Sequence, residues 1–250
     1  MARAEPLYSM HPMVRAVLFD LDDTLFDHQY CARAALGIVR SMHDSFVRME
    51  VSELEAAHSR ILEAIHAEVM LGRIALDVAR VERFRQLYQM AGIEADHELA
   101  ARTAVAYRDG YINARRAVAG AAELLAAVRK RAKVGIVSNN LLEEQRQKLR
   151  HCGLEGYCDA LIVSEEFGFS KPDPKLFEIA LSRLGCAADE AVMVGDSWAA
   201  DVLGAIAAGV RPVWFNRNGS LPPDPALRVG EITSLDDLNG AIRMIFDGED

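Results

Sequence analysis

The sequence lacks the long apolar runs of a membrane protein and the positive charge of a nucleic-acid binder. No run approaches the roughly 20 apolar residues that a membrane-spanning helix needs. The 37 acidic residues outnumber the 28 lysines and arginines, which gives a net charge of −9. We therefore expect no membrane partner and no nucleic-acid partner. Residues 1–13 contain no apolar core of a secretory signal, and we expect them to be a frayed extension in which Met13 is an alternative start.

Cysteine is scarce as well. The four cysteines are Cys31, Cys152, Cys158 and Cys186, and none of them forms a CxxC pair. This spacing fits neither a disulfide framework nor a zinc site. We expect reduced thiols in a cytoplasmic protein.

The composition that remains is that of an ordinary globular protein, with 51% apolar and 26% charged residues. Residues 29–114 contain no proline and no strand-like apolar run, and their apolar residues recur at helical spacing. This stretch predicts a bundle of about four helices. From residue 117 onward, short apolar strands alternate with helices, which predicts a doubly wound parallel α/β sheet with right-handed crossovers.

The two patterns predict a discontinuous α/β core with an inserted all-helical domain. The core would comprise residues 1–26 and 115–250, and the insertion residues 27–114. The predicted core strands are the apolar run before Asp20 and residues 133–137, 160–163, 191–194 and 210–215. The predicted core helices include residues 121–131, 142–151, 174–184 and 235–246.

The first predicted strand runs into three carboxylates within four positions, those of Asp20, Asp22 and Asp23. Adjacent carboxylates repel one another, so a site that holds them needs a cation, a proton or open water. The carboxyl end of a parallel strand is also where open α/β sheets bind their ligands. We interpret the cluster as a carboxylate nucleophile and an acid/base partner that share a divalent metal. The alternative is a solvated acidic turn.

Polar residues also follow later strands. Ser138 and Asn139 end the second predicted strand, Lys171 precedes a helix, and Asp196 and Asp201 follow the fourth strand. Each has an ordinary explanation, because Ser138 and Asp196 suit helix N-caps. Lys171 and Asp201 would ordinarily be solvated. Their order along the chain favours one shared crevice.

Four motifs in this order resemble the signatures of the haloacid dehalogenase (HAD) superfamily. They are DxDxT at residues 20–24, the serine at position 138, the lysine followed by Pro-Asp-Pro at residues 171–174, and GDxxxxD at residues 195–201. The resemblance implies a Rossmann-like core, and the inserted helices resemble a C1-type cap. Within the superfamily, this insertion is similar to the caps of nucleotidase-like and sugar-phosphatase-like members.

The resemblance implies a Mg²⁺-dependent phosphatase that hydrolyses a small phosphomonoester, either a nucleotide or a sugar phosphate. Asp20 would attack phosphorus and form an aspartyl-phosphate. Asp22 would act as the general acid and then as the general base. Thr24 would steady the loop that carries both aspartates, and Asp201 would orient Lys171 or a metal-bound water.

The remaining implied roles concern the phosphate and the metal. Ser138, Asn139 and Lys171 would bind the phosphoryl group of the substrate. Asp20, the backbone carbonyl of Asp22, and Asp196 would hold Mg²⁺, which prefers oxygen ligands.

Other reactions of the superfamily are alternatives for this chain, and the motif residues favour some of them more than others. A phosphomutase also needs Asp22 and is the main alternative. Dehalogenases lack this second aspartate, because halide departs unprotonated. Phosphonatases use a cap lysine, whereas residues 27–114 contain no lysine. A non-catalytic binding protein would have lost at least one motif residue.

Several residues and properties are left without an assigned role. We expect Asp23 to be solvated. Arg73, Arg80, Arg83 and Arg85 either face a second anionic group of the substrate or form a solvated helix face, and the solvated face explains them better. The protein would be a monomer or a homodimer.

Overall fold

The computed structural model describes residues 13–248, so the extension expected at residues 1–13 lies outside the described residues except for Met13. In the described part, six parallel strands form one sheet in the order β3-β2-β1-β4-β5-β6. This result confirms the parallel α/β sheet. The strands are β1 (Ala16–Phe19), β2 (Lys133–Ser138), β3 (Ala160–Val163), β4 (Ala191–Gly195), β5 (Arg211–Phe215) and β6 (Gly230–Ile232).

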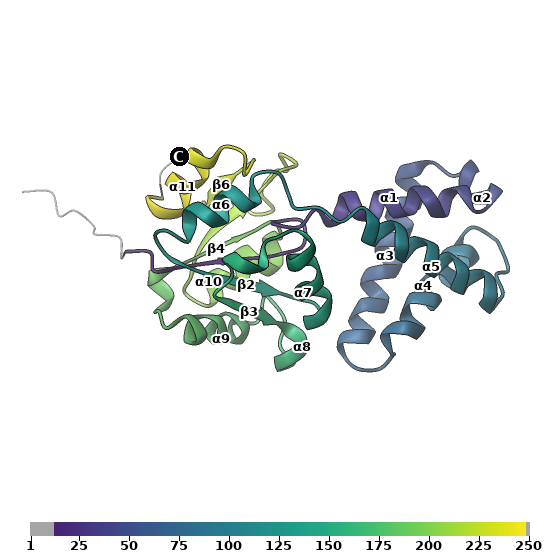
Figure 1. Cartoon of the computed structure of the whole chain (residues 1–250), viewed down its shortest axis with the longest axis horizontal. Coiled ribbons are helices and arrows are strands. Elements are labelled where there is room, and N and C mark those ends of the chain that lie inside the picture. The colour runs from purple at the N-terminus through teal and green to yellow at the C-terminus, as the bar shows by residue number, and fades with distance from the viewer. Residues whose placement is uncertain (1–12, 249–250) are drawn as a thin grey trace, which may run out of the picture.

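Helices cover both faces of the sheet (Figure 1). Val17 and Phe19 of β1 pack on one face, in a cluster that includes residues of α6 (Ala121–Val128) and α11 (Leu238–Phe246). Leu18 points to the other face and packs in a cluster with residues of α9 (Pro174–Leu184) and α10 (Leu203–Ala207). Since successive side chains of a strand alternate between faces, a strand covered on both sides reads as a continuous apolar run.

The remaining core elements are helical. They are α7 (Leu142–His151), α8 (Ser164–Phe167), the 3₁₀ turns η1 (Glu155–Tyr157) and η2 (Ala188–Glu190), and the π-turn η3 (Trp198–Val202). Two predicted helices are shorter than expected. The helix predicted at 121–131 ends at Val128, and the one predicted at 235–246 begins at Leu238, where the Asp237 side chain accepts a hydrogen bond from Gly240 N.

Between β1 and β2, the chain forms a separate helical lobe (Figure 1). This helical insertion consists of α1 (His28–Ser41), α2 (Asp44–Arg48), α3 (Val51–Met70), α4 (Leu76–Met90) and α5 (His97–Asn113). The sequence predicts about four helices, and the additional one is the five-residue α2. Its start is capped by the His43 side chain, which accepts from Ser45 N at 3.2 Å. Phe46, Phe84 and Tyr88 lie fully buried inside the lobe.

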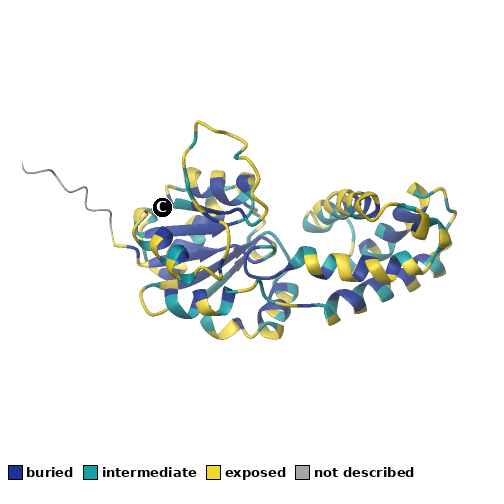
Figure 2. Cartoon of the chain, turned by 90° about the horizontal axis from the view of Figure 1, so that it is seen from above, coloured by how far each residue is buried: buried dark blue, intermediate teal, exposed yellow. Residues whose placement is uncertain are grey.

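The two connections between the lobes run side by side (Figure 2). Phe26 and Ala117 form an antiparallel bridge, and Asp27 N donates to the carbonyl of Arg116. The buried Asp27 carboxylate accepts from Arg116 at 2.6 Å and from Arg217, which follows β5, at 2.9 Å. Asp27 therefore ties both connections to the core. Among residues 13–248, no helix is long and apolar enough to cross a membrane.

Candidate active site

The strand register brings the predicted site residues to one edge of the sheet. Phe19 of β1 aligns with Ile136 of β2 and Val194 of β4, so the residues that follow these three strands emerge together. They surround a cavity of about 180 Å³. All the predicted site residues except Thr24 line it, namely Asp20, Asp22, Ser138, Asn139, Lys171, Asp196 and Asp201.

Lys171 lies at the centre of this cavity wall and is 5% exposed. Its Nζ donates to Asp20 Oδ1 at 2.6 Å, to Asp201 Oδ1 at 2.7 Å and to the Val137 carbonyl at 2.8 Å. Burial lowers the pKa of Lys171, but the two carboxylates outweigh it and raise the pKa above its ordinary value. The solvated-lysine alternative is therefore wrong, and the ammonium is a fixed positive charge beside Asp20.

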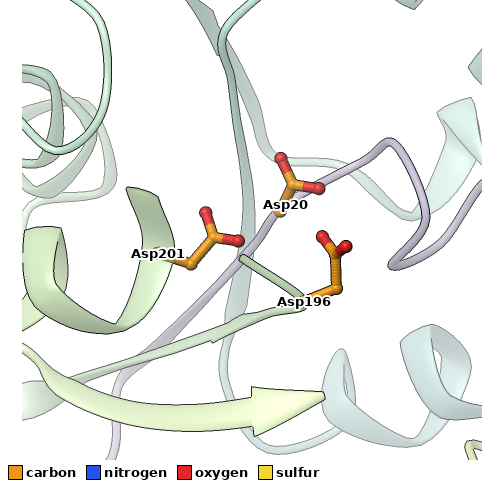
Figure 3. A group of neighbouring side chains, drawn as sticks. All are labelled: Asp20, Asp196 and Asp201. Carbon is orange, nitrogen blue, oxygen red and sulfur yellow. The ribbon is translucent and has the colours of Figure 1, made fainter. Parts of the chain in front are cut away.

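Three carboxylates converge at the cavity (Figure 3). Oxygen atoms of Asp20, Asp196 and Asp201 all lie within 4.8 Å of one another. Burial and then the neighbouring charges raise the pKa of Asp196 to about 8. Burial likewise raises the pKa of Asp20 to about 7, although Lys171 opposes the rise. A cation would relieve this repulsion, and an all-oxygen donor set fits a hard divalent ion such as Mg²⁺.

Asp201 is distinct from the other two because both of its oxygens already have partners. Oδ1 accepts from Lys171, and Oδ2 accepts from Ser197 N at 2.9 Å. Its side chain is 1% exposed, so the solvated-carboxylate alternative for this residue is wrong. Asp201 sits on η3, and such π-turns occur often at functional sites. The helical turn after Asp196 is capped by Ser197, which also excludes the capping alternative for Asp196.

Thr24 joins the aspartate loop to the end of β4. Its Oγ1 accepts from Asp196 N at 3.1 Å and lies 3.4 Å from Asp196 Oδ1 as a donor.

The expectation that Asp23 is solvated is wrong. Asp23 is half-buried at a φ of 65°, and its carboxylate accepts from Gln29 N at 2.8 Å. This bond links the tight turn to the first helix of the insertion, and short polar side chains tolerate that left-handed conformation.

The carboxylate of Asp22 points to α7. It accepts from Lys148 Nζ at 2.5 Å, from Gln145 Nε2 at 2.9 Å and from Asn140 Nδ2 at 3.1 Å. Burial raises the pKa of Asp22, but the Lys148 ammonium, then His28, and the hydrogen bonds from Lys148 and Gln145 outweigh it and hold the pKa well below its usual range. Asp22 is therefore an ionised group with a cationic partner.

Sequence reasoning missed Lys148 and Gln145. Both are buried, although Lys and Gln in a helix are ordinarily surface residues. Two features were available as a signal: they stand three positions apart, which places them on one helix face, and their helix follows directly after the Ser138 motif.

Ser138 and Asn139 hold neighbouring groups in place. The buried Ser138 hydroxyl accepts from Gln145 Nε2 at 2.6 Å. The N-cap of the next helix is Leu141, so Ser138 is not that cap. Asn139 Nδ2 donates to the Lys171 carbonyl at 2.8 Å, and Asn139 Oδ1 accepts from Lys171 N at 2.7 Å. The amide of Asn139 thus fixes the backbone that carries Lys171, and its predicted contact with substrate stays a prediction.

A second cavity, of about 330 Å³, lies between the core and the helical insertion. It shares Asp22 and Asn139 with the inner cavity, so the two adjoin at the aspartate loop. Its insertion-side wall contains Arg83, Tyr107 and Tyr111. The hydroxyl of Tyr111 lies 2.7 Å from Nδ1 of His28.

Glu144 of α7 bridges the two lobes at the edge of this second cavity. Its carboxylate contacts Arg80 at 2.7 Å, Arg108 at 3.0 Å and Arg115 at 3.4 Å. Arg80 and Arg108 belong to the helical insertion, and Arg115 lies in the return connection. Burial raises the pKa of Glu144, but the arginines outweigh it and lower the pKa. This cluster is the principal charged contact between the insertion and α7.

The fold and the site together define an α/β enzyme with a ligand crevice at the carboxyl edge of its sheet, where a buried carboxylate faces a buried lysine and a carboxylate cluster. The chain belongs to the haloacid dehalogenase-like hydrolase family, whose family model matches residues 14–209. The membership expected from the four motifs is confirmed, and the protein is a hydrolase of this superfamily.

Relatives with assigned activities cover nearly the whole chain. The phosphoserine phosphatase of Thermus thermophilus is 32% identical over 252 residues, with 89% of this chain and 98% of that protein covered. The pyrimidine 5'-nucleotidase YjjG of Escherichia coli is 28% identical over 227 residues, with 89% and 95% covered. Among solved structures, the HAD-hydrolase YfnB of Bacillus subtilis bound to magnesium has 27% identity and a TM-score of 0.71, with 92% of this chain and 99% of that chain covered.

Proposed function

We propose that the protein hydrolyses a small phosphomonoester, a nucleotide or a sugar phosphate, through an aspartyl-phosphate on Asp20. The observation that carries the proposal is the pairing of Asp20, 7% exposed at the wall of the inner cavity, with the fixed ammonium of Lys171. A buried carboxylate beside a permanent cation suits attack on an anionic phosphoryl group, because the cation offsets the charge that would otherwise repel the nucleophile. The nucleotidase and phosphoserine phosphatase among the relatives support a phosphomonoester substrate.

In the first step, an oxygen of the Asp20 carboxylate forms a bond to phosphorus while the bond to the leaving oxygen breaks. Lys171 neutralises charge on the phosphoryl oxygens, and the Ser138 hydroxyl donates a hydrogen bond to one of them. Asp201 and Asn139 act through Lys171, because they hold its side chain and its backbone respectively.

Asp22 transfers a proton in both steps. As general acid it protonates the leaving oxygen, and as general base it takes a proton from the water that hydrolyses the aspartyl-phosphate. Its ion pair with Lys148 favours the ionised form, which is the state that the second step needs. The first step needs a proton on Asp22. Because the ion pair with Lys148 keeps the pKa of Asp22 low, this ion pair has to loosen before Asp22 can be protonated.

Asp20, the backbone carbonyl of Asp22, and Asp196 would hold Mg²⁺ in this proposal. The fit rests on the converging carboxylates and their raised pKa values. Both oxygens of Asp201 are already occupied, so it orients Lys171 and is not a direct ligand. The bound ion would supply further neutralisation of phosphoryl charge.

We also propose that the helical insertion, residues 27–114, is the cap domain of the enzyme. The second cavity lies between this insertion and the core, so the leaving group of the substrate would occupy it. Cavities of a few hundred Å³ accommodate small metabolites. A cytoplasmic location, inferred from the unpaired cysteines, belongs to the same proposal.

Two other reactions of the superfamily and a non-catalytic role are the alternatives to this proposal. A dehalogenase releases halide, which needs no proton, and so gives no reason for Asp22 to be held by three donors. A phosphomutase would use the same residues but return the phosphoryl group to the substrate. A non-catalytic role gives no reason for the full set around Asp20 to be retained.

Phosphate release from a panel of nucleoside monophosphates, sugar phosphates and phosphoserine tests the proposal, with Mg²⁺ and with EDTA. We expect metal-dependent release that is concentrated on one chemical class. Isomerisation of a sugar phosphate without net release would favour the mutase, and halide release from a 2-haloacid would favour the dehalogenase. A folded protein with none of these activities would contradict an enzymatic role.

A further inference from the structure

Arg83 of α4 is a half-buried cation whose charge is unmatched in the described part of the chain. It lines the second cavity, and its Nε is enclosed without a hydrogen-bond partner among residues 13–248. No carboxylate of those residues lies within salt-bridge distance of its guanidinium. Burying a charge without a partner is unfavourable, so the position calls for an explanation.

The neighbouring arginines have the partners that Arg83 lacks. Arg80 and Arg108 are bound to Glu144. Arg73 and Arg85 pair with Glu68 and Glu82 on the outside of the insertion. The solvated helix face expected from the sequence therefore describes Arg73 and Arg85. It does not describe Arg80 and Arg83, which line the second cavity, and of these two only Arg80 has a carboxylate partner among residues 13–248.

The walls around Arg83 hold it in place but do not neutralise it. The guanidinium carbon lies 5.1 Å from the ring centre of Phe84 and 4.9 Å from that of Tyr107. Burial lowers the pKa of Arg83, Tyr107 opposes this shift, and the nearby charges of Arg80 and Arg108 lower the pKa further. Among the acidic residues that line the cavity, Asp22 and Glu144 are already paired, and Glu63 is exposed on α3.

We propose that Arg83 binds a carboxylate on the leaving group of the substrate, so that the preferred substrate is a phosphomonoester that also carries a carboxylate. This proposal rests on the phosphatase function proposed above and names its substrate class. Because the inner and second cavities share Asp22 and Asn139, a substrate with its phosphate at Asp20 extends toward Arg83.

A carboxylate matches the free guanidinium of Arg83 in both shape and charge. A planar guanidinium matches the two oxygens of a carboxylate with parallel hydrogen bonds. One free cation balances one carboxylate charge, whereas a phosphate monoester brings about −2 at neutral pH. The other two arginines that line the cavity are engaged with Glu144, which leaves Arg83 available to the substrate.

Matched substrate pairs test the proposal. Within each pair, an acid and an alcohol differ only in a carboxylate against a hydroxymethyl group: 3-phosphoglycerate against glycerol 3-phosphate, and 6-phosphogluconate against glucitol 6-phosphate. The two chain lengths sample the distance between the phosphate and Arg83. The variants are Arg83→Met, which removes the charge, Arg83→Lys, which keeps it without the planar fork, and Arg85→Met as an exposed control on the same helix.

We expect the wild-type protein to favour the acid in at least one pair. Arg83→Met should reduce kcat/KM for that acid about tenfold to a hundredfold, mostly through KM, because a charge-assisted contact is lost. The alcohol and p-nitrophenyl phosphate should be unaffected, Arg83→Lys should restore part of the preference, and Arg85→Met should behave as wild type. Equal losses for acid and alcohol, or a wild-type protein without acid preference, would overturn the proposal.

A calorimetric titration separates this outcome from failure of the phosphatase function. The Asp20→Asn variant should bind without turnover, and the same acids and alcohols are titrated into it with and without Arg83→Met. Hydrolysis of p-nitrophenyl phosphate without any acid preference would refute the role of Arg83 alone. Absence of all hydrolysis, with Arg83-dependent binding of the acid, would refute the phosphatase function and leave the carboxylate site standing.

Discussion

Lys148 Nζ lies 2.5 Å from Asp22 Oδ1, and the two side chains join α7 to the aspartate loop. The lysine side chain is 5% exposed and the aspartate side chain 24%, so solvent weakens this ion pair little. The pair gives the proposed acid/base residue a partner separate from Lys171, which serves Asp20. Each of the two aspartates thus has its own buried lysine.

Replacing Lys148 with methionine should slow the hydrolysis of the aspartyl-phosphate at mildly acidic pH. Without the ammonium, burial raises the pKa of Asp22 unopposed by its main partner, so less of it is ionised to accept a proton from water. We expect kcat to fall about tenfold or more near pH 6 and to recover toward pH 8, in line with the size of general-base contributions. The pH profile of kcat measures this effect.

Lys130→Met is the matched control for this variant, because Lys130 is exposed at the end of α6. It should reproduce the wild-type profile. A Lys148→Met profile that superimposes on the wild type would show that the ion pair has no influence on Asp22 during turnover.

Stabilisation of the fold by Mg²⁺ should increase with pH. Protons compete with the cation for Asp20 and Asp196, whose pKa values are raised to about 7 and about 8. Below these values the carboxylates are protonated and bind the ion weakly, and above them they are free to bind it. The rise in Tm on adding saturating Mg²⁺ should therefore be small near pH 6 and larger near pH 9.

Comparing Tm with and without the ion cancels the titration of groups that do not contact it, such as the buried His58. Asp196→Asn should abolish most of the difference at both pH values. An equal rise in Tm at both pH values in the wild type would contradict the assignment of the carboxylate cluster as the metal site.

Glu144→Gln should destabilise the protein, because it removes the charge that three arginines share. The Glu144 side chain is only 18% exposed, so we expect a loss of about 1–2 kcal/mol in the free energy of unfolding. The lowered pKa of Glu144 means that this contribution is present above its ordinary pKa of 4.5 and is lost as the pH falls below it. Urea unfolding at neutral and acidic pH measures both effects.

Glu143→Gln is the control here, since the neighbouring Glu143 side chain is 63% exposed. It should change the unfolding free energy by a few tenths of a kcal/mol at most. A Glu144→Gln protein as stable as the wild type would mean that the arginine cluster does not hold the two lobes together.

Most of the fold could be predicted because buried parallel strands leave a strong signal. The apolar runs that became β1 and β4 are wholly buried. The exception is β6 (Gly230–Ile232), which the sequence did not predict. Three residues, one of them a glycine and one a glutamate, carry no periodicity, and only pairing with β5 makes this segment a strand.

The site residues that belong to motifs at strand ends could be predicted from the sequence. The site residues that are recognisable only by their burial in the folded protein were missed. Asp20 and Lys171 carry their signal in motif position. Lys148 and Arg83 look like ordinary helix surface residues in the sequence. Their environments come from the long-range packing of α7 against the aspartate loop and of the insertion against the core. The local signal for Lys148 is limited to its place on the same helix face as Gln145, directly after the Ser138 motif.

Acid quenching during turnover, followed by mass spectrometry of the digested protein, tests the central claim most directly. We predict one phosphoryl group on the peptide that contains Asp20. The Asp20→Asn variant should fold as the wild type does, carry no label and lose at least about a thousandfold in kcat. Label on another residue, or wild-type turnover by highly purified Asp20→Asn protein, would contradict covalent catalysis by Asp20.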